Sequence, residues 1–192
     1  MIIYMEAEGI VNECWRSVSG HINYQIPNIG RVRDATTGRI LKPDTSGRGY
    51  FTIRLSMGGT STKFVIHRLV AQEFIENPAE KPYVDHIDGV RTNNCVSNLR
   101  WVSQSENNMN SRKPNSRKSS IYKGVAWDSH HARWRVQIMK DKTSYFVGHY
   151  HNAKDAARAY NAKAVELFGE YAYLNDISDD EDEAELPPSY PA

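Results

Sequence analysis

The stretch VDHIDGVRTNNCVSNLRWVSQSEN, residues 84–107, decides how the middle of this chain folds. Its first residues end a predicted strand at Asp85 and His86, and the Asp-Gly pair that follows is typical of a tight turn. A second apolar segment comes next, and Ser103–Glu106 then has the Ser-x-x-Glu spacing of a helix capping box. The pattern therefore predicts a strand, a loop, a second strand and a helix that starts at Ser103.

The same stretch gathers the side chains that metal-assisted cutting of a phosphodiester needs. Such hydrolysis requires a hard cation to offset charge on the phosphate and a base to deprotonate water. Mg²⁺ prefers oxygen ligands, which Asp85 and Asn107 can supply, and His86 can serve as the base. Adjacent strand residues point to opposite faces, so Asp85 and His86 converge only if the strand breaks beside the turn at Asp88. The alternative interpretation is a polar turn with a hydrogen-bonded histidine.

Turn residues and hydrophobic periodicity divide the chain into small modules. The first module is rich in short strands, and its segment YFTIRL, residues 50–55, alternates apolar and polar residues as a half-buried strand does. Its other predicted strands are WRSV, NYQIP, GRVRD and GRILKP. The second module opens with an amphipathic helix, HRLVAQEFI, residues 67–75. The predicted boundaries are 10–63 for the β-rich module, 64–112 for the module with the hairpin, 113–120 for a basic linker, 121–175 for a third module and 176–192 for a disordered acidic tail.

The third module is predicted to form a three-stranded antiparallel sheet packed on one helix. Its segment RWRVQI, residues 133–138, alternates apolar and polar residues, so one face packs on a core while the other presents hydrogen-bond donors. Asn152 is expected to cap the following helix, and Gly169 is expected to end it. The predicted fold class is therefore α+β, arranged in small modules.

No metal site is expected in the third module. The histidines of the third module are scattered along its sequence and form no evident ligand set: His130, His131, His149 and His151. The two cysteines, Cys14 and Cys95, lie far apart and form no CxxC pair, so a structural zinc site is not expected either.

The charge of the chain is divided between a basic body and an acidic tail. The net charge is +1, yet the residues after Asn175 carry seven acids and no Lys or Arg. Without those seven acids, residues 1–175 carry 24 basic against 16 acidic side chains, a net charge of +8. Such asymmetry favours a polyanionic partner. The simplest interpretation of the tail is a solvated appendage, and competition with DNA for the basic surface is the alternative.

Composition points to a soluble, intracellular protein. Hydrophobic residues make up 40% and charged residues 24%, and no apolar run is long enough to cross a bilayer. The beginning, MIIYMEAEG, lacks the basic segment and apolar block of a secretion signal. Unpaired cysteines fit a reducing compartment. We therefore expect an intracellular location and no membrane partner.

Residues 67–107, from HRLVAQEFI to WVSQSEN, resemble the HNH nucleases of the phage and intron homing-endonuclease branch. The resemblance implies a ββα-metal nuclease core in which His86 is the general base and Asn98 ties the loop together by hydrogen bonds. It implies that Asp85 and Asn107 bind the metal, as in a His-Asn-Asn variant of the family. The implied cofactor is Mg²⁺, with Mn²⁺ as a possible substitute.

Both flanks resemble modules that bind DNA. Residues 15–34, WRSVSGHINYQIPNIGRVRD, are similar to the nuclease-associated modular (NUMOD) segments found upstream of such nucleases. Residues 122–175 resemble the APETALA/ethylene-response-factor domain, which lays a three-stranded sheet in the DNA major groove. That resemblance implies DNA contacts by Lys123, Trp127, Arg133, Arg135 and Gln137. Ala126 and Asp128 stand where plant domains usually have arginines, so the resemblance does not extend to a target sequence.

Together these features predict a Mg²⁺-dependent, site-specific DNA endonuclease of the homing type, encoded by a phage or another mobile element. We expect it to nick double-stranded DNA as a monomer, without an obligate protein partner. One alternative is a transcription regulator with an inactive HNH scaffold, which would bind DNA and never cut it. A weaker alternative is a defence or host-takeover nuclease, which would cut with little sequence preference.

Overall fold

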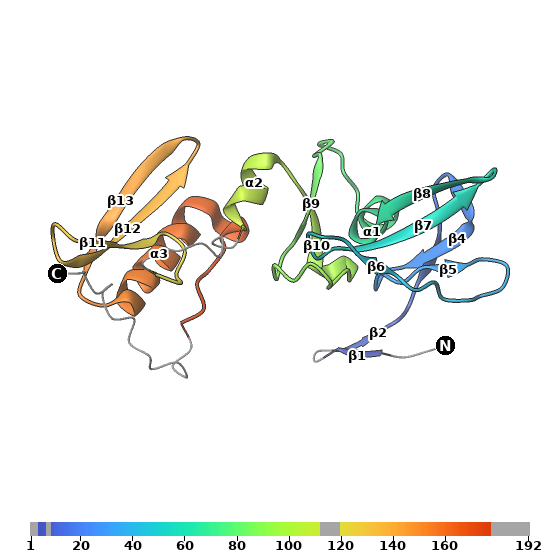
Figure 1. The fold of residues 1–192 in the computed structure, drawn as a ribbon, viewed down its shortest axis with the longest axis horizontal. Helices are drawn as coiled ribbons and strands as arrows, with labels where there is room; N and C mark the ends of the chain where they lie inside the picture. The colour runs from blue at the N-terminus through green and yellow to red at the C-terminus, as the bar shows by residue number, and fades with distance from the viewer. Residues whose placement is uncertain (1–3, 7–8, 112–119, 178–192) are drawn as a thin grey trace. The chain divides into compact units, whose positions relative to one another are not determined.

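The computed structural model describes residues 4–6, 9–111 and 120–177 (Figure 1). The fold is mixed α and β, with small sheets and few helices. It divides into two compact units, Met1–Gln104 and Ser105–Ala192. Most of the predicted basic linker and acidic tail lies outside the described residues. Among the described residues, no helix is long and apolar enough to span a membrane.

The first unit is built mainly from short antiparallel strands. Its strands form a three-stranded sheet β3-β4-β5, a second three-stranded sheet β6-β7-β8, and the two-stranded pairs β1-β2 and β9-β10. The elements are β1 (Tyr4–Glu6), β2 (Gly9–Val11), β3 (Trp15–Val18), β4 (His21–Pro27), β5 (Arg33–Asp34), β6 (Asp44–Thr45), β7 (Phe51–Met57), β8 (Thr60–Val65), α1 (Ile66–Phe74), β9 (Tyr83–His86), the single 3₁₀ turn η1 (Val96–Asn98) and β10 (Leu99–Val102).

Most of the strands predicted for the first module are present, and one is not. WRSV, NYQIP and YFTIRL fall on β3, β4 and β7, and GRVRD ends in the short β5. The predicted strand GRILKP, residues 38–43, is wrong, because this segment forms a single bridge between Arg33 and Ile40. Thr52, on the predicted polar face of β7, is buried because it lies opposite Asp44 on β6 and donates to its carbonyl.

The core of the first unit joins the β-rich module to the segment with the hairpin. On α1, Ile66, Leu69 and Val70 have the i, i+3, i+4 spacing of one helix face and are all buried. They pack with apolar side chains of the strands into one cluster: Val18, Ile26, Val32, Ile53, Leu55, Ala71, Val84 and Leu99. The hairpin is therefore held on the same core as the sheets before it.

The order predicted around the hairpin, strand, loop, strand and helix, is confirmed. β9 is followed by a loop, η1, β10 and then α2 (Gln104–Met109), whose first residue directly follows Ser103. The predicted helix of residues 67–75 is α1, which starts one residue earlier and ends at Phe74. Apart from its first residue, α2 belongs to the second unit.

The second unit contains a three-stranded antiparallel sheet covered on one face by a helix, as predicted (Figure 1). Its further elements are β11 (Val125–Asp128), β12 (Arg133–Lys140), β13 (Thr143–Tyr150), α3 (Ala153–Phe168) and the short η2 (Gly169–Tyr171). The Asn152 side chain accepts a hydrogen bond from the Asp155 N–H at 2.7 Å, and Gly169 ends α3 with a φ of +54°. Both predicted caps are thus confirmed.

The small side chains of α3 let it approach the sheet closely. Ala156, Ala157 and Ala164 are completely buried and pack with Tyr160 against the apolar face of β12, which carries Trp134 and its alternating partners. Leu167, predicted on the same stripe, is half-buried at the edge of this core. The opposite face of the sheet is left without a helix among the described residues of this unit.

Candidate active site and nucleic-acid interface

The hairpin formed by β9 and β10 fixes the two central site residues by its register. Asp85 lies opposite Arg100, and His86 lies opposite Leu99. Both residues belong to β9, so the strand break that the sequence suggested before His86 does not occur, and the turn follows at residues 87–88. Consecutive strand residues face opposite sides. Asp85 and His86 therefore start on different faces of the hairpin.

Asp85 forms an ion pair with its cross-strand partner. Its Oδ2 accepts hydrogen bonds from Nε of Arg100 at 3.1 Å and from Nη2 at 3.0 Å. Both side chains are largely buried, with exposed fractions of 14% for Arg100 and 10% for Asp85. A fork of two bonds from one guanidinium fixes the plane of the carboxylate. Arg100 thus orients the carboxylate that was predicted to bind the metal.

His86 is buried among aromatic rings. Its ring meets His67 of α1 edge-on at 4.8 Å between centroids and stacks against Tyr50 at 6.0 Å. Only 4% of the surface of His86 is exposed, and this burial lowers its pKa below the ordinary 6.5. The hydrogen bond with Asn94 and the charges of Asp88 and Asp85 act in the opposite direction. The imidazole is therefore neutral at neutral pH and able to accept a proton.

A hydrogen bond accepted by Asn94 selects the tautomer of His86. Nε2 of His86 lies 3.2 Å from Oδ1 of Asn94, which is itself buried. A carboxamide oxygen can only accept, so Nε2 must carry the proton. In this tautomer the lone pair is on Nδ1, and that nitrogen is the basic one.

Asn98 closes the loop between the two strands. Its Nδ2 donates to Oδ1 of Asp88 and to the carbonyl of Asn93, both at 2.9 Å, and its Oδ1 accepts the Asp88 N–H at 3.0 Å. Asp88 also accepts from the Val90 N–H at 2.7 Å. Partial burial raises the pKa of Asp88, but these hydrogen bonds outweigh it and hold the pKa below its ordinary value. Together these hydrogen bonds fix the conformation of the turn at Asp88.

Asn107, the second predicted ligand, lies on α2. It is half-buried and occupies the fourth position of this six-residue helix. Asn107 belongs to the second unit, whereas Asp85, His86 and Asn98 belong to the first. The structure therefore brings the first-unit residues onto one hairpin, and Asn107 as a ligand stays a prediction.

His67 is a titratable group that the sequence analysis did not assign to the site. Its Nδ1 is buried without a hydrogen-bond partner among the described residues. Burial, followed by the charges of His86 and Arg68, lowers the pKa of His67 to about 3. Protonation of this ring is thus strongly disfavoured in the folded state.

Stability of the first unit should depend on pH through His67. The unfolded chain binds a proton near pH 6.5 and the folded chain near pH 3, so stability is lost as the pH falls through this window. Replacing His67 by phenylalanine should reduce the slope of the free energy of unfolding against pH by about 1.4 kcal/mol per pH unit between pH 6 and 4.5. Urea unfolding followed by tryptophan fluorescence measures this slope. Equal slopes in wild type and variant would contradict the assignment.

Gly30 packs directly against Asn94 and thereby supports His86. A Cβ at Gly30 would lie 2.4 Å from Cβ of Asn94, and the Gly30 φ is +78°. Gly38 has a φ of +70°, and a Cβ there would meet no described atom within 4 Å, so it is the matched control.

We expect Gly30→Ala to lower the free energy of unfolding by about 2 kcal/mol more than Gly38→Ala, because it adds overpacking to the same backbone strain. It should also slow any DNA cleavage by displacing Asn94 from His86. Denaturant unfolding and a cleavage assay on both variants check this. Equal stabilities and equal cleavage rates of the two variants would show that Gly30 and Asn94 do not support His86.

The exposed face of the sheet in the second unit carries three of the predicted DNA-binding side chains. Trp134, Val136 and Ile138 of β12 are buried, and the residues between them face away from α3. Those residues are Arg133, Arg135 and Gln137. Nη2 of Arg135 donates to Oε1 of Gln137 at 3.0 Å, and Gln137 donates to Ser144. The predicted donor face is thus present.

The other two predicted DNA-binding residues lie elsewhere in the unit. Nζ of Lys123 donates to the carbonyls of Met109 and Ser111, both at 2.7 Å, and burial lowers its pKa to about 8. Trp127 lies opposite Trp134 and meets it edge-on at 5.2 Å, so it shares the apolar face. Neither side chain joins the arginine face, and as DNA contacts both stay predictions.

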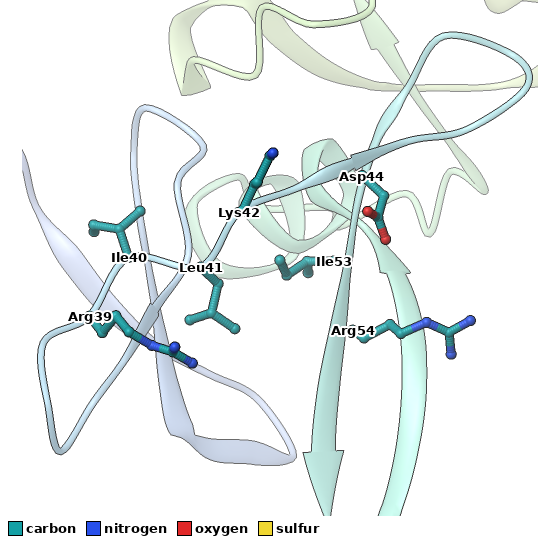
Figure 2. A pocket seen from close by; sticks show the side chains of 7 residues that line it. All are labelled: Arg39, Ile40, Leu41, Lys42, Asp44, Ile53 and Arg54. Atoms are coloured by element: carbon teal, nitrogen blue, oxygen red, sulfur yellow. The ribbon is translucent and has the colours of Figure 1, made fainter.

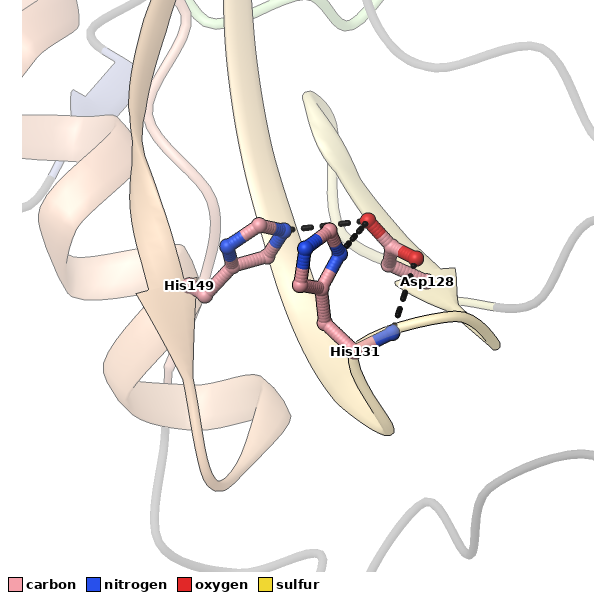
Figure 3. A group of neighbouring side chains, drawn as sticks. All are labelled: Asp128, His131 and His149. Atoms are coloured by element: carbon pink, nitrogen blue, oxygen red, sulfur yellow. Dashed lines mark hydrogen bonds and ion pairs between the residues drawn. The ribbon is translucent and has the colours of Figure 1, made fainter.

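The histidines of the second unit are not all scattered, which corrects the sequence interpretation. Asp128, His131 and His149 each offer one ligand atom, and these atoms lie within 4.8 Å of one another (Figure 3). The sequence separation of 21 residues between Asp128 and His149 concealed the group, because it forms only through the pairing of the three strands.

A hollow of about 360 Å³ lies in the first unit (Figure 2). It is lined by residues 39–42, by Asp44 and by Ile53 and Arg54 of β7. The lining includes the cations Arg39, Lys42 and Arg54, with one carboxylate. This composition suits contact with a phosphate backbone more than an apolar ligand.

Comparison with protein-family models matches residues 65–109 to the HNH endonuclease model and residues 13–56 to the NUMOD4 motif. Among curated proteins, the chain is 42% identical over 94 residues to DNA endonuclease I-HmuI of Bacillus phage SP01, covering 48% of this chain and 54% of that protein. It is 31% identical over 132 residues to the uncharacterized HNH endonuclease L560 of Acanthamoeba polyphaga mimivirus, covering 68% of this chain and 65% of that protein.

A solved structure described as DNA binding and cleavage by the HNH homing endonuclease I-HmuI is 42% identical, with a TM-score of 0.45, and covers 47% of this chain and 52% of that one. The chain spans about a quarter to two thirds of the length of these and similar relatives. The two matched family segments both end before residue 110. The resemblance of residues 122–175 to the APETALA/ethylene-response-factor domain thus rests on the sequence pattern alone.

Proposed function

We propose that this chain, which contains an HNH endonuclease domain and a NUMOD4 motif and is homologous to I-HmuI, is a metal-dependent, site-specific DNA endonuclease of the homing type. The observation that carries the proposal is the HNH match over residues 65–109, because that segment includes the hairpin with Asp85 and His86. The proposed substrate is double-stranded DNA inside the host cell of a phage or another mobile element. The proposed reaction is a nick made by a monomer.

His86 is the proposed general base. Burial keeps its imidazole neutral, so the ring can accept the proton of a water molecule, and the hydrogen bond between Nε2 and Asn94 holds the ring in place. The hydroxide equivalent attacks phosphorus in line with the departing 3′ oxygen. The products are then a 5′-phosphate and a 3′-hydroxyl end.

The donor chemistry of Asp85, which precedes His86 on β9, fits a hard divalent cation. Asp85 offers carboxylate oxygen, the ligand type that Mg²⁺ prefers, and Arg100 orients that carboxylate from the neighbouring strand. When bound, Mg²⁺, or Mn²⁺ as a substitute, offsets negative charge on the scissile phosphate and the leaving oxygen. We retain Asn107 as the proposed second oxygen ligand on the basis of the family resemblance.

Asn98 acts as a positioning residue in this proposal. Its three hydrogen bonds hold the loop between Asp88 and Asn93, directly after the strand that carries His86. Asn98 therefore fixes where β9 ends, and with it the direction of the His86 ring. We do not assign it a contact with the reacting atoms.

The exposed sheet face of the second unit is the proposed DNA-contacting surface, in keeping with its resemblance to the APETALA/ethylene-response-factor domain. Arg133 and Arg135 offer donors to phosphates and base edges, and Gln137 adds a carboxamide beside them. In the first unit, Arg39, Lys42 and Arg54 are proposed to contact the DNA backbone.

Replacing Arg135 by alanine should weaken DNA binding and reduce the slope of log affinity against log salt by about 1 if this side chain contacts a phosphate. Arg158→Ala is the matched control, because Arg158 lies on α3 and pairs with Asp155 at 2.8 Å. Fluorescence anisotropy at several salt concentrations measures both slopes. If Arg158→Ala loses as much DNA affinity as Arg135→Ala, the DNA does not specifically contact the exposed sheet face that carries Arg135.

The rival function is a DNA-binding regulator with an inactive nuclease scaffold. Incubation of the whole chain with a random-sequence DNA library and Mg²⁺, followed by sequencing of new 5′ ends, separates the alternatives. A homing-type enzyme yields one dominant cleavage site on one strand. Binding without any new ends, in Mg²⁺ and in Mn²⁺, supports the regulator, and ends spread over many sequences support a nuclease with little preference.

A further inference from the structure

The trio of Asp128, His131 and His149 lies outside the HNH segment and takes no part in the cleavage chemistry proposed above. Asp128 is the last residue of β11, His131 lies in the turn before β12, and His149 is on β13 (Figure 3). Nδ1 of His131 and Nε2 of His149 each lie 3.0 Å from the same oxygen, Oδ2 of Asp128. Three elements thus deliver three donor atoms to one point.

The turn after β11 holds the carboxylate in this orientation. Oδ1 of Asp128 accepts the backbone N–H groups of His130 at 3.1 Å and His131 at 3.3 Å. Oδ1 therefore accepts hydrogen bonds from the backbone of the turn, and Oδ2 faces the two imidazole rings. The rings lie close together, with centroids 4.5 Å apart and planes inclined by 32°.

These separations are close to those of ligands that share one metal ion. Zinc binds histidine nitrogen and carboxylate oxygen at about 2.0–2.2 Å in a tetrahedral arrangement, which places neighbouring ligand atoms about 3.3 Å apart. The two nitrogen–oxygen pairs at 3.0 Å already meet this requirement. The two nitrogens, which lie within 4.8 Å of each other, need a ring adjustment of about 1 Å to share one ion.

A β-bulge in β12–β13 creates the site. The register shifts between Val136 and Gln137, so His149 lies opposite Arg135 on the exposed face. Gln137 lies opposite Phe146. If that register continued along the two strands without the shift, His149 would lie opposite Trp134, on the face that α3 covers. Asp128 lies opposite Arg133 and so shares the exposed face. The bulge therefore turns the third ligand toward the other two.

We propose that Asp128, His131 and His149 form a binding site for a divalent transition-metal ion of the zinc class, which links β11 and its turn to β13. Two imidazoles and one carboxylate select Zn²⁺ and similar ions over Mg²⁺, because imidazole nitrogen suits borderline ions and Mg²⁺ demands oxygen. Water fills the remaining position. The site lies on the proposed DNA-contacting face and is distinct from the Mg²⁺ site at Asp85.

Calorimetric titration of the full chain with Zn²⁺, in buffer containing excess Mg²⁺, tests the site. Wild type should bind one Zn²⁺, and His131→Ala and His149→Ala should each weaken this binding by at least about 10-fold. His151→Ala controls for an exposed histidine directly after β13, and Asp85→Asn controls for binding at the hairpin. Both controls should stay within about 2-fold of wild type, since neither removes a ligand.

Circular dichroism without metal shows whether each variant folds. His131 is 54% exposed, so its replacement should be tolerated even where that of His149 is not. Folded wild type that binds no Zn²⁺ would overturn the proposal. So would Zn²⁺ binding that survives both His131→Ala and His149→Ala, or binding that is lost in Asp85→Asn and retained in His131→Ala.

Discussion

Replacing His86 by alanine is expected to slow DNA cleavage by about 100- to 10,000-fold, the range over which a general base acts, and to leave DNA affinity within about 2-fold. The reason is that the neutral ring is the proposed acceptor of the proton of water, whereas the proposed DNA contacts lie on other elements. Single-turnover cleavage with enzyme in excess measures the chemical step, and anisotropy measures affinity on the same DNA.

His130→Ala is the control for this experiment, because His130 is exposed and lies in the second unit. Both variants must retain the circular dichroism spectrum of the wild type. Cleavage by His86→Ala at the wild-type rate would exclude His86 as the base. A parallel loss of cleavage and of affinity would instead identify His86 as a binding residue.

Replacing Asp85 by asparagine is expected to have the second largest effect. The change keeps the size of the side chain but removes the charge that attracts the cation, so cleavage at low Mg²⁺ should fall by at least about 100-fold. It also leaves the largely buried guanidinium of Arg100 without its ion-pair partner, which should lower the free energy of unfolding by about 3 kcal/mol.

Arg100→Leu separates the two effects of that change. It breaks the same ion pair and should lower stability by a similar amount, about 3 kcal/mol, but it keeps the carboxylate that the cation needs. Below its melting temperature, Arg100→Leu should therefore cut DNA far faster than Asp85→Asn. Equal cleavage by the two variants would mean that the pair at Asp85 and Arg100 serves stability and not metal binding.

Local features of the sequence predicted local features of the fold. The start of α2 after Ser103, the cap at Asn152 and the alternation in β12 all depend on residues within one turn or one strand of each other. The turn at Asp88 was likewise recognisable from its Asp-Gly pair, whereas the loop-closing role of Asn98 was implied by the family resemblance. Such short-range patterns survive packing because the backbone itself imposes them.

Contacts between distant segments could not be predicted in the same way. His67 and Tyr50 meet His86 from α1 and from the residue before β7, and nothing in their own periodicity indicates this. The ion pair of Asp85 with Arg100 could have been found, since it follows from the register of the hairpin. The trio at Asp128 depends on a one-residue bulge, which reverses the face that His149 occupies.

We propose that the hairpin of residues 83–102 cuts DNA with the help of a divalent cation. The test is the single-turnover rate of DNA cleavage by the wild-type chain on the target sequence recovered from the random-sequence library. This rate is measured in Mg²⁺ and again in excess EDTA, at equal DNA occupancy. We expect strand cleavage in Mg²⁺ and binding without cleavage in EDTA. Saturated binding with no cleavage in Mg²⁺ or Mn²⁺, or an equal rate in EDTA, would contradict this proposal.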